Sequence, residues 1–517
     1  MLIGWWFKKM IRRRTITSYV WNSVSGNKMV ILSNCIRNFF RKFELLGNSV
    51  QGENPTPDNP QEIKSAGRKS KNLFNIADLR VGQVQKDGAI NEKQIYYRTV
   101  ILDVPQDGKY RITFNSNDDY TMLYFTEAYA NGAYLQPYLR VHAGSPNYYI
   151  TLAKGKNILS FSTHTASEKI VFTTDHNIMI AAESETLDYE PYGYFFDLKI
   201  IGKNLLSNKP TDWMIGKTTS WGAVPQTPVS YGKNVKNAIA IINVKSSTNY
   251  SFINKETNKL WVCRIIELDA NGLGLVNHAL YANESFNYKK YNFSTRSNTA
   301  NIVFEIKKVD NTELLSTDIE SIKIMLVEGE ADENAPYEPY TEQSVQIALD
   351  EPLRGIGEYK DVLTKDGVVR RIKRIVFDGS EDEKWGIGIE RENVIDFVST
   401  QFSDATKINE HQRSMMDKLK WSSGVWGRDE IGQDMFARIL RINMPKTLAP
   451  DLQTFKTWLS QNPLIVDYVL AEPVTEPLPE SVQAQLAALH SENGTTHVLV
   501  DSGEVECGIN IEYKYKS

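Results

Sequence analysis

The sequence predicts a mostly β protein: two tandem jelly-roll β-sandwiches and a C-terminal β-rich domain with one short helix. Among 517 residues, 25 Tyr, 20 Phe and 10 Trp favour strands over helical bundles. Short segments alternate apolar and polar residues between Asn-Gly, Asp-Gly and proline-containing turns, which is typical of antiparallel sheets. A set of landmarks also occurs twice in the same order, which predicts a repeated module.

Composition excludes several classes of protein. Hydrophobic residues make up 41% of the chain and charged residues 24%, which is ordinary for a folded protein and excludes global disorder. No run of about 18 apolar residues occurs, so the sequence predicts no transmembrane helix. The net charge of −4 gives no general affinity for nucleic acid, and we expect no nucleic-acid partner. Three widely spaced cysteines, Cys35, Cys263 and Cys507, exclude a disulfide framework or a zinc cluster.

The N-terminal segment is basic, whereas the rest of the chain is acidic. Residues 1–43 contain nine Lys or Arg and no acid; because the total charge is −4, residues 44–517 carry −13. Positive charges follow the apolar tip Met1–Phe7 instead of preceding it, so this tip is not a secretory signal. We interpret residues 1–46 as a basic aromatic arm that docks on an acidic partner, packs on its own body or lies on a membrane surface.

One helix is predicted within this arm. Four apolar residues follow the i, i+3, i+4, i+7 spacing of a single helix face, and a glycine ends the pattern at Gly47. The four residues are Ile36, Phe39, Phe40 and Phe43.

Two copies of one module follow the entry segment 47–67, at residues 68–197 and 198–341. Each copy has an opening motif, an Ala-Asn-Gly turn, an apolar strand and a Tyr-Glu-Pro-Tyr closure. The paired landmarks are Lys71–Phe74 and Lys203–Leu206, Ala130–Gly132 and Ala270–Gly272, Asn177–Ile180 and Ile322–Val327, and Tyr189–Tyr192 and Tyr337–Tyr340. Four landmarks in one order indicate a tandem duplication. The strands predicted from alternation are Tyr110–Phe114, Asn249–Ile253 and Leu260–Leu268.

The C-terminal third, residues 342–517, differs from the modules. Alternation predicts a strand at Ser344–Leu349. Val482, Leu486 and Leu489 share one face and predict a helix. The alternating segments Thr496–Val500 and Val505–Ile511 flank the turn Asp501–Gly503 and predict a terminal hairpin.

These motifs, taken as a set, resemble minor structural tail proteins from phages and prophages of Gram-positive bacteria. The resemblance spans residues 43–517. It is carried by the motifs already described and by Gly47–Gly52, Pro55–Pro60, Pro352–Gly357 with Asp361, Phe377–Glu381 and Tyr468–Pro473. The resemblance implies a virion tail component near the baseplate or tail tip, built from carbohydrate-binding-like sandwiches.

Known catalytic motifs do not occur. The seven histidines show no metal-ligand spacing, and no nucleophile elbow, Walker loop or dinucleotide fingerprint is present. Glu127 and Glu267 occupy equivalent positions in separate modules, so they do not supply the paired carboxylates of a glycosidase. We expect Asn117–Asp119 to form a solvated turn; a structural calcium site is the less favoured alternative. We therefore expect no enzyme activity and no cofactor.

Saccharide binding would rest on aromatic side chains. A pyranose ring stacks on Trp or Tyr, and neighbouring polar groups bind its hydroxyls. The candidates in the second module are Trp213, Trp221, Trp261 and Arg264; those in the first are Tyr96, Tyr97, Tyr148 and Tyr149. For each of them the alternative is a core or rim aromatic residue.

The sequence thus predicts a non-enzymatic phage tail protein in the virion, made in the host cytoplasm, which binds host cell-wall saccharide. A tail-borne cell-wall hydrolase and a bacterial surface adhesin are the alternatives. The expected partners are other tail or baseplate proteins and further copies of the chain, with a trimer as the expected homo-oligomer.

Overall fold

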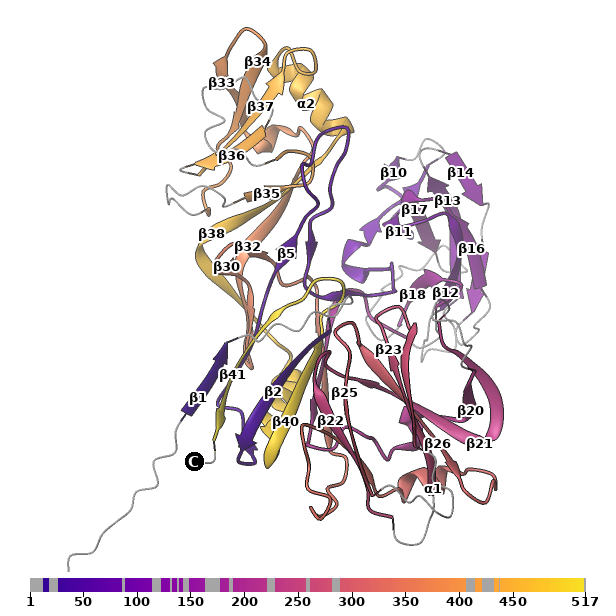
Figure 1. The fold of residues 1–517 in the computed structure, drawn as a ribbon. Coiled ribbons are helices and arrows are strands. Elements are labelled where there is room, and N and C mark those ends of the chain that lie inside the picture. Colours follow the sequence, from indigo (N-terminus) through magenta and orange to yellow (C-terminus); the bar gives the residue numbers. More distant parts are fainter. Residues whose placement is uncertain are drawn as a thin grey trace, which may run out of the picture. The chain divides into compact units, whose positions relative to one another are not determined.

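The computed structural model describes residues 13–17, 27–85, 89–113, 122–130, 133–136, 139–142, 148–162, 177–185, 189–220, 228–256, 261–280, 289–405, 414–420, 432–436 and 438–515. The chain forms two compact units. Residues 1–67, 196–347 and 353–517 form the first, and residues 68–195 and 348–352 form the second. Strands dominate both units, which confirms the mostly β class (Figure 1). Within the described ranges, no helix is long and apolar enough to span a membrane.

The second unit is a two-sheet sandwich that contains the first module. Its larger sheet runs in the order β14 (Ala133–Gln136), β13 (Met122–Ala130), β17 (Gly155–Ser162), β11 (Arg98–Val104) and β8 (Arg80–Val81), with β15 (Leu139–His142) on β13. Its smaller sheet is β16 (Tyr148–Leu152), β12 (Gly108–Thr113) and β18 (Met179–Ala182). The short elements are β9 (Gln83–Val84), paired with β10 (Ile90–Asn91), η1 (Ile76–Asp78) and β7 (Arg68–Lys69).

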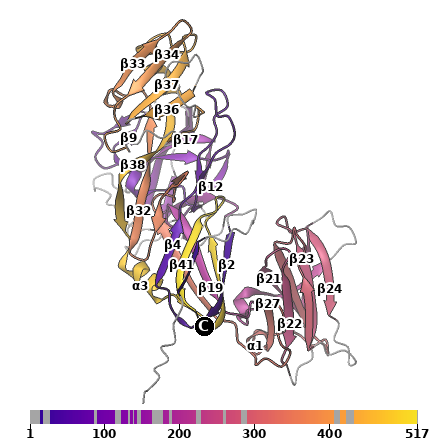
Figure 2. The ribbon, with the colours of Figure 1, turned by 60° about the vertical axis from the view of Figure 1, so that its left-hand side comes forward.

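The second module, within the first unit, is a sandwich of the same plan. One sheet runs β20 (Trp213–Ser220), β21 (Ser230–Asn243), β26 (Asn301–Lys308), β23 (Trp261–Leu268) and β24 (Gly274–Leu280). The other is β25 (Lys290–Ser294), β22 (Asn249–Asn254) and β27 (Ile324–Glu328) (Figure 2). Two short helices, η3 (Pro210–Asp212) and α1 (Ser316–Glu320), complete it.

Both modules have one strand order, as the tandem duplication predicts. The order β13-β17-β11-β8 in the first corresponds to β23-β26-β21-β20 in the second, and β16-β12-β18 corresponds to β25-β22-β27. Successive strands cross between the sheets in the same sequence in both copies, as in jelly rolls. The strands predicted at 110–114, 249–253 and 260–268 are present as β12, β22 and β23, apart from Phe114 and Leu260, which lie outside the described residues.

Buried asparagines explain why the opening motif recurs. The Asn72 side chain donates to Ile178 O (2.9 Å) and accepts from the backbone N–H groups of Phe74 and Ile180. Asn204 repeats this arrangement with Ile324 O, Leu206 N and Leu326 N. The amide thus ties the opening loop to the last strand of each module and satisfies backbone groups that the sheet leaves unpaired.

The first unit also contains a central pair of sheets built from both ends of the chain. One sheet runs β2 (Asn27–Cys35), β40 (Gly494–Asp501), β19 (Tyr194–Ile201) and β28 (Glu342–Leu349). The other runs β1 (Arg13–Thr17), β41 (Gly508–Lys514), β4 (Lys42–Leu46), β31 (Val362–Leu363), β32 (Gly367–Phe377), β38 (Leu464–Pro477) and β35 (Ser414–Met416).

Residues 36–43 are not helical, so that prediction is wrong. They form β3 (Asn38–Phe39), which pairs with β39 (His490–Ser491), and the start of β4, which pairs with β41. Burial alternates along β4, where Phe43 and Leu45 are fully buried. Because β41 offers a complete hydrogen-bonding partner, tertiary pairing overrides the apparent helical period. Residues 27–46 therefore pack on their own body.

The predicted terminal hairpin is also wrong. β40 and β41 are present as strands, but they belong to different sheets. Ser502, Val505 and Cys507 of the connection between them are buried: Ser502 Oγ donates to Val505 O, and Cys507 N donates to Ser502 Oγ. The chain thus crosses from one layer to the other at residues 502–507, as corners of a sandwich do.

The remaining C-terminal elements form a small α+β layer. Its sheet runs β33 (Trp385–Glu390), β34 (Val394–Ser399), β37 (Ile439–Pro445) and β36 (Gly432–Phe436), beside α2 (Leu452–Gln461). The predicted C-terminal helix is α3 (Glu480–Ala488), with Leu486 and Leu489 buried. The other short elements are β5 (Ser49–Val50) with β6 (Lys64–Ser65), β29 (Gly355–Ile356) with β30 (Tyr359–Lys360), and η4 (Glu381–Glu383).

Two of the residues that carry the family resemblance, Gly47 and Asp361, lie at a buried junction of the first unit. Gly47 N donates to Asp361 O (2.7 Å), and a Cβ at Gly47 would clash with the carbonyl oxygen of Arg354. The Asp361 carboxylate is fully buried and accepts from the backbone N–H groups of Arg354, Arg371 and Ile372. These two residues therefore serve chain packing, because a side chain at Gly47 would clash with the backbone of residue 354 and the Asp361 carboxylate satisfies three buried backbone N–H groups.

Candidate saccharide-binding surfaces

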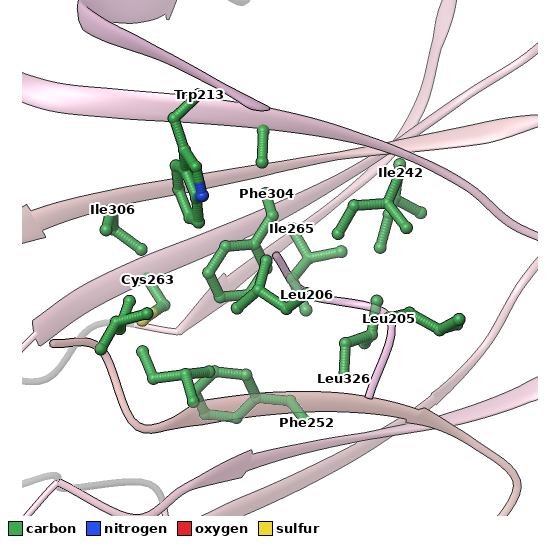
Figure 3. Close-up of a cluster of buried hydrophobic side chains, with 14 of the residues drawn as sticks. Leu205, Leu206, Trp213, Ile242, Phe252, Cys263, Ile265, Phe304, Ile306 and Leu326 are labelled. Atoms are coloured by element: carbon green, nitrogen blue, oxygen red, sulfur yellow. The ribbon is translucent and has the colours of Figure 1, made fainter. Parts of the chain in front are cut away.

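Two predicted tryptophan platforms lie in the core of the second module. Trp213 is 6% exposed, its indole N–H donates to Ser207 O (2.8 Å), and its ring packs edge-on against Phe304 (Figure 3). Trp261 is 1% exposed and belongs to the same hydrophobic cluster. Neither indole has a face open to a sugar, so the expectation of stacking at Trp213 and Trp261 is wrong. Trp221 lies outside the described residues.

Arg264, predicted beside these tryptophans, is held by a buried carboxylate. Glu305 is 5% exposed and accepts from Arg264 (2.5 Å), Asn237 (2.7 Å) and the hydroxyl of Thr218 (2.6 Å). Thr219 donates to it through its hydroxyl and its N–H. Burial raises the pKa of Glu305, but the hydrogen bonds outweigh burial and the pKa lies below its usual value. Arg264 is therefore a structural partner in the observed arrangement.

Glu305 and its partners hold the outer parts of β20 and β21, a two-stranded ribbon, against the rest of the sheet. Pairing between β20 and β21 jumps from Ile215↔Ala238 to Lys217↔Lys233, beside Gly216 at φ +78°, and both strands curve strongly there (Figure 1). The ribbon ends reach back across the sheet, since Val229 N bonds Gly272 O (2.9 Å). We name residues 217–220 and 228–233 the ribbon.

A second apolar cluster lies under the ribbon. On β26, Ile302, Phe304 and Ile306 face the sandwich core, whereas Val303 faces the other side of the sheet. Val303 is nevertheless fully buried with Ile239, Ile266 and Leu268, because Val229 and Tyr231 of the ribbon and Met214 pack on them. The ribbon therefore covers the part of the outer face around Val303, whereas Ile241 on the same face stays 49% exposed.

Tyr149 is the predicted aromatic residue that best fits a saccharide surface. It lies opposite Arg111 on the outer face of the smaller sheet of the first module. Lys109 Nζ lies 4.2 Å and the Arg111 guanidinium carbon 5.5 Å from its ring centroid. Lys109 also pairs with Glu183 (3.0 Å), and Arg111 donates to Glu183 O (3.2 Å). An aromatic ring flanked by hydrogen-bond donors is the chemistry that sugar recognition needs.

The other tyrosines of the first module are less suited. Tyr148 packs against the hydrophobic core. Tyr96 and Tyr97 are half-buried in the turn before β11, where Tyr97 O accepts from Gly82 N and from Arg98. The structure thus separates Tyr149 from its neighbour Tyr148, as alternation along a strand requires.

The equivalent sheet face in the second module is apolar and covered. There, Ile253, Met325 and Val327 are buried beneath Ala331 and Tyr337 from the closing segment. The two copies therefore share a strand order but differ on this face: the first presents Lys109, Arg111 and Tyr149. Sequence reasoning did not single out Lys109 and Arg111, although Arg111 lies at a polar position of the predicted strand Tyr110–Phe114 and Lys109 directly precedes that strand.

A polar trio in the second module was also missed. Glu267 Oε1 lies 2.8 Å from His278 Nε2, and His278 Nδ1 lies 3.1 Å from the Tyr291 hydroxyl. Thr299 and the N–H of Arg296 bond the other carboxylate oxygen. Burial raises the pKa of Glu267, but these hydrogen bonds hold it below its usual value. The Glu127 side chain, its repeat equivalent, and Asn117–Asp119 lie outside the described residues, and the described part of the chain contains no metal-ligand cluster.

Comparisons with known proteins show no family. No protein-family model matches the chain, and no curated protein matches it. An alignment with the structure of infectious bursal disease virus Gt strain covers 99% of this chain and 82% of that chain, at 6% identity and a TM-score of 0.11. An alignment with the VP2 subviral particle of the same virus covers 97% of this chain and 83% of that chain, at 7% identity and a TM-score of 0.12. Scores this low establish no shared fold.

Proposed function

We propose that this chain is a non-enzymatic structural component of a phage tail tip or baseplate. The observation that carries the proposal is the tandem pair of sandwiches with one strand order, each tied by a buried asparagine and followed by a strand of the central sheet. The family resemblance of the motifs supports the same function.

We propose further that the first module binds host cell-wall saccharide at Tyr149. Tyr149 offers a ring for stacking, and Lys109 and Arg111 offer donors for hydroxyl groups. Single-site affinity for a wet sugar is weak, and several copies on one particle raise it through avidity. The second module as the better binder stays a prediction that depends on Trp221 alone.

Immunogold labelling of purified phage particles tests the structural function. We expect antibody against this chain to label the tail tip. Particles that lack the chain, as judged by labelling and by mass spectrometry of their proteins, would contradict it. Release of sugars or peptides from purified cell walls by the purified chain would favour the tail-borne hydrolase instead.

Adsorption of the purified chain to cell walls tests the saccharide surface. Tyr149→Ala should weaken adsorption about fivefold, which corresponds to about 1 kcal/mol of lost stacking. Tyr149→Phe should keep most of the binding because the ring remains. Tyr189→Ala, an exposed tyrosine of the same module, is the matched control. Equal adsorption of Tyr149→Ala and the control would remove Tyr149 from the proposal.

A further inference from the structure

We infer that an exposed basic–aromatic stripe of this chain docks on an acidic–apolar stripe of a second copy. The basic stripe is Arg37, Phe39 and Arg41, and the acidic stripe is Glu472, Val474 and Glu476. The inference rests on the proposed tail component being a homo-oligomer, as the sequence analysis expects, and names the surface that would form it.

Phe39 is the most exposed of the large hydrophobic residues in the described part of the chain, at 59%. Its neighbour Phe40 is buried at 1%, so the sequence points one aromatic ring inward and leaves the next in water. The ring of His490 lies beside it, with centroids 6.3 Å apart. An exposed aromatic ring flanked by arginines has the composition of an interface hot spot.

The two arginines are only loosely neutralised within the chain. Arg37 Nε lies 3.9 Å from Glu492 Oε2, and Arg41 lies 3.9 Å from Glu512 Oε1. Their side chains are 61% and 37% exposed, whereas the carboxylates are 14% and 22% exposed. Ion pairs at this distance and exposure bind weakly, so both guanidinium groups have donors left for an anionic partner.

The acidic stripe lies in the last part of β38, where every residue from 472 to 477 is exposed. Val474 is 53% exposed. Glu476 bonds Arg370 (2.8 Å) yet keeps 52% of its side chain exposed. Pro473 and Pro477 remove two N–H groups from this strand, so a partner is held by side chains instead of by strand addition. Glutamates thus lie two positions before and two positions after Val474, just as arginines lie two positions before and two positions after Phe39.

The charge distribution of the whole chain favours a second copy as the occupant. Residues 1–43 hold nine basic residues and no acid, and residues 44–517 carry −13. Contact between two different patches of identical chains is heterologous, and such contacts close into rings when the rotation permits. If the basic stripe of each copy contacts the acidic stripe of the next copy, both stripes gain a partner of opposite charge.

Mass measurement of the full-length chain tests the inference. We expect wild type to form an oligomer that weakens at high salt, because its contacts are ionic at the rim. Phe39→Ala, the pair Arg37→Glu with Arg41→Glu, and Glu472→Arg should each weaken self-association at least about tenfold. Combining Arg37→Glu, Arg41→Glu and Glu472→Arg in one chain should restore part of the association, since the charges are exchanged.

Exposed charges elsewhere give the controls: Arg80→Glu and Glu358→Lys should leave the oligomer unchanged. A wild-type monomer at all concentrations overturns the inference, as does an oligomer that survives every stripe variant. Immunogold labelling of particles tests the tail proposal separately. A chain that is found at the tail tip but is monomeric when purified would refute only the contact between the stripes.

Discussion

Asn72 and Asn204 show at the scale of single residues what the repeated motif does. Each is almost fully buried, at 2% and 1% exposure, and each bonds backbone groups of two separate segments. A buried amide that satisfies several backbone groups cannot be exchanged for an apolar residue without leaving donors and acceptors unpaired. The sequence predicted the repeat from these residues but not their role, because hydrogen-bond partners about 110 residues away leave no local pattern.

Replacing either asparagine by alanine should destabilise its own module. We expect a loss of about 2–4 kcal/mol in the free energy of unfolding, from several unmet backbone hydrogen bonds. Urea unfolding measures this loss, and Trp213 and Trp261, buried in the core of the second module, contribute to a fluorescence signal of its unfolding. Asn271→Ala, at an exposed turn, is the control. Equal stability of Asn204→Ala and this control would mean that the amide is dispensable.

His497 should make stability depend on acid. It is fully buried on β40, its Nδ1 lies 2.9 Å from Gly202 O, and Lys245 and Glu328 are its charged neighbours. Burial, with the nearby Lys245 cation, lowers its pKa to about 4. The unfolded chain takes up its proton near pH 6.5, so stability should fall between about pH 6.5 and about pH 4, by up to about 3 kcal/mol.

Unfolding of wild type and His497→Asn across this pH range measures the effect. Asparagine keeps a donor for Gly202 O but does not titrate. The difference in stability between the two proteins should therefore shrink as the pH falls. A constant difference would show that His497 does not cause the acid sensitivity.

At the scale of elements, strands with local alternation were predictable and their partners were not. Burial alternates along β12 and β28 as predicted, whereas β22 and β23 form the predicted strands but are buried on both faces. The segment 36–43 satisfied a helical spacing by coincidence, and only pairing with β41 decided its conformation. The ribbon over the second module was equally hidden, because it depends on a pairing jump at Gly216. Trp213 and Trp261 are buried because they face the core between the two sheets of the second module.

Glu305 should hold the ribbon in place. Glu305→Ala leaves the guanidinium of Arg264 and the side chain of Asn237 without their partner, and should cost about 3 kcal/mol of stability. Thermal unfolding measures this loss, and limited proteolysis within residues 217–233 should become faster. Replacing Glu305 and Arg264 together by Leu and Met should cost less, because no charge is left unpaired. An unchanged cleavage rate would show that the Glu305 cluster does not hold the ribbon in place.

At the scale of the whole molecule, the sequence predicted modules better than it predicted surfaces. Landmark order predicted two modules of one plan, and the two share a strand order, whereas the central sheets join segments from opposite ends of the chain, which no periodicity reveals. Of the eight predicted site residues, Tyr149 is half-buried beside two cations, and two tryptophans are core residues.

The modular plan predicts independent folding. A fragment of residues 202–341 has its own core and should unfold cooperatively when expressed alone. Calorimetry of the full chain should then show more than one transition, one of which matches the fragment. A fragment without dispersed methyl signals in its NMR spectrum would mean that the module needs the central sheets.

The pairing of both chain ends has a consequence for biosynthesis. Asn27 of β2 pairs with Asp501 of β40, and Phe43 of β4 pairs with Ile511 of β41. The strands β2 and β4 therefore emerge from the ribosome early, and their partners β40 and β41 emerge last. The sandwiches, whose strand pairs are closer in sequence, can form during translation, while residues 27–46 wait as an unpaired, aromatic-rich segment. A nonsense mutation near codon 490 would therefore release a chain with folded modules but without β40 and β41, the strands with which β2 and β4 pair, and such a product should be recognised by chaperones and proteases.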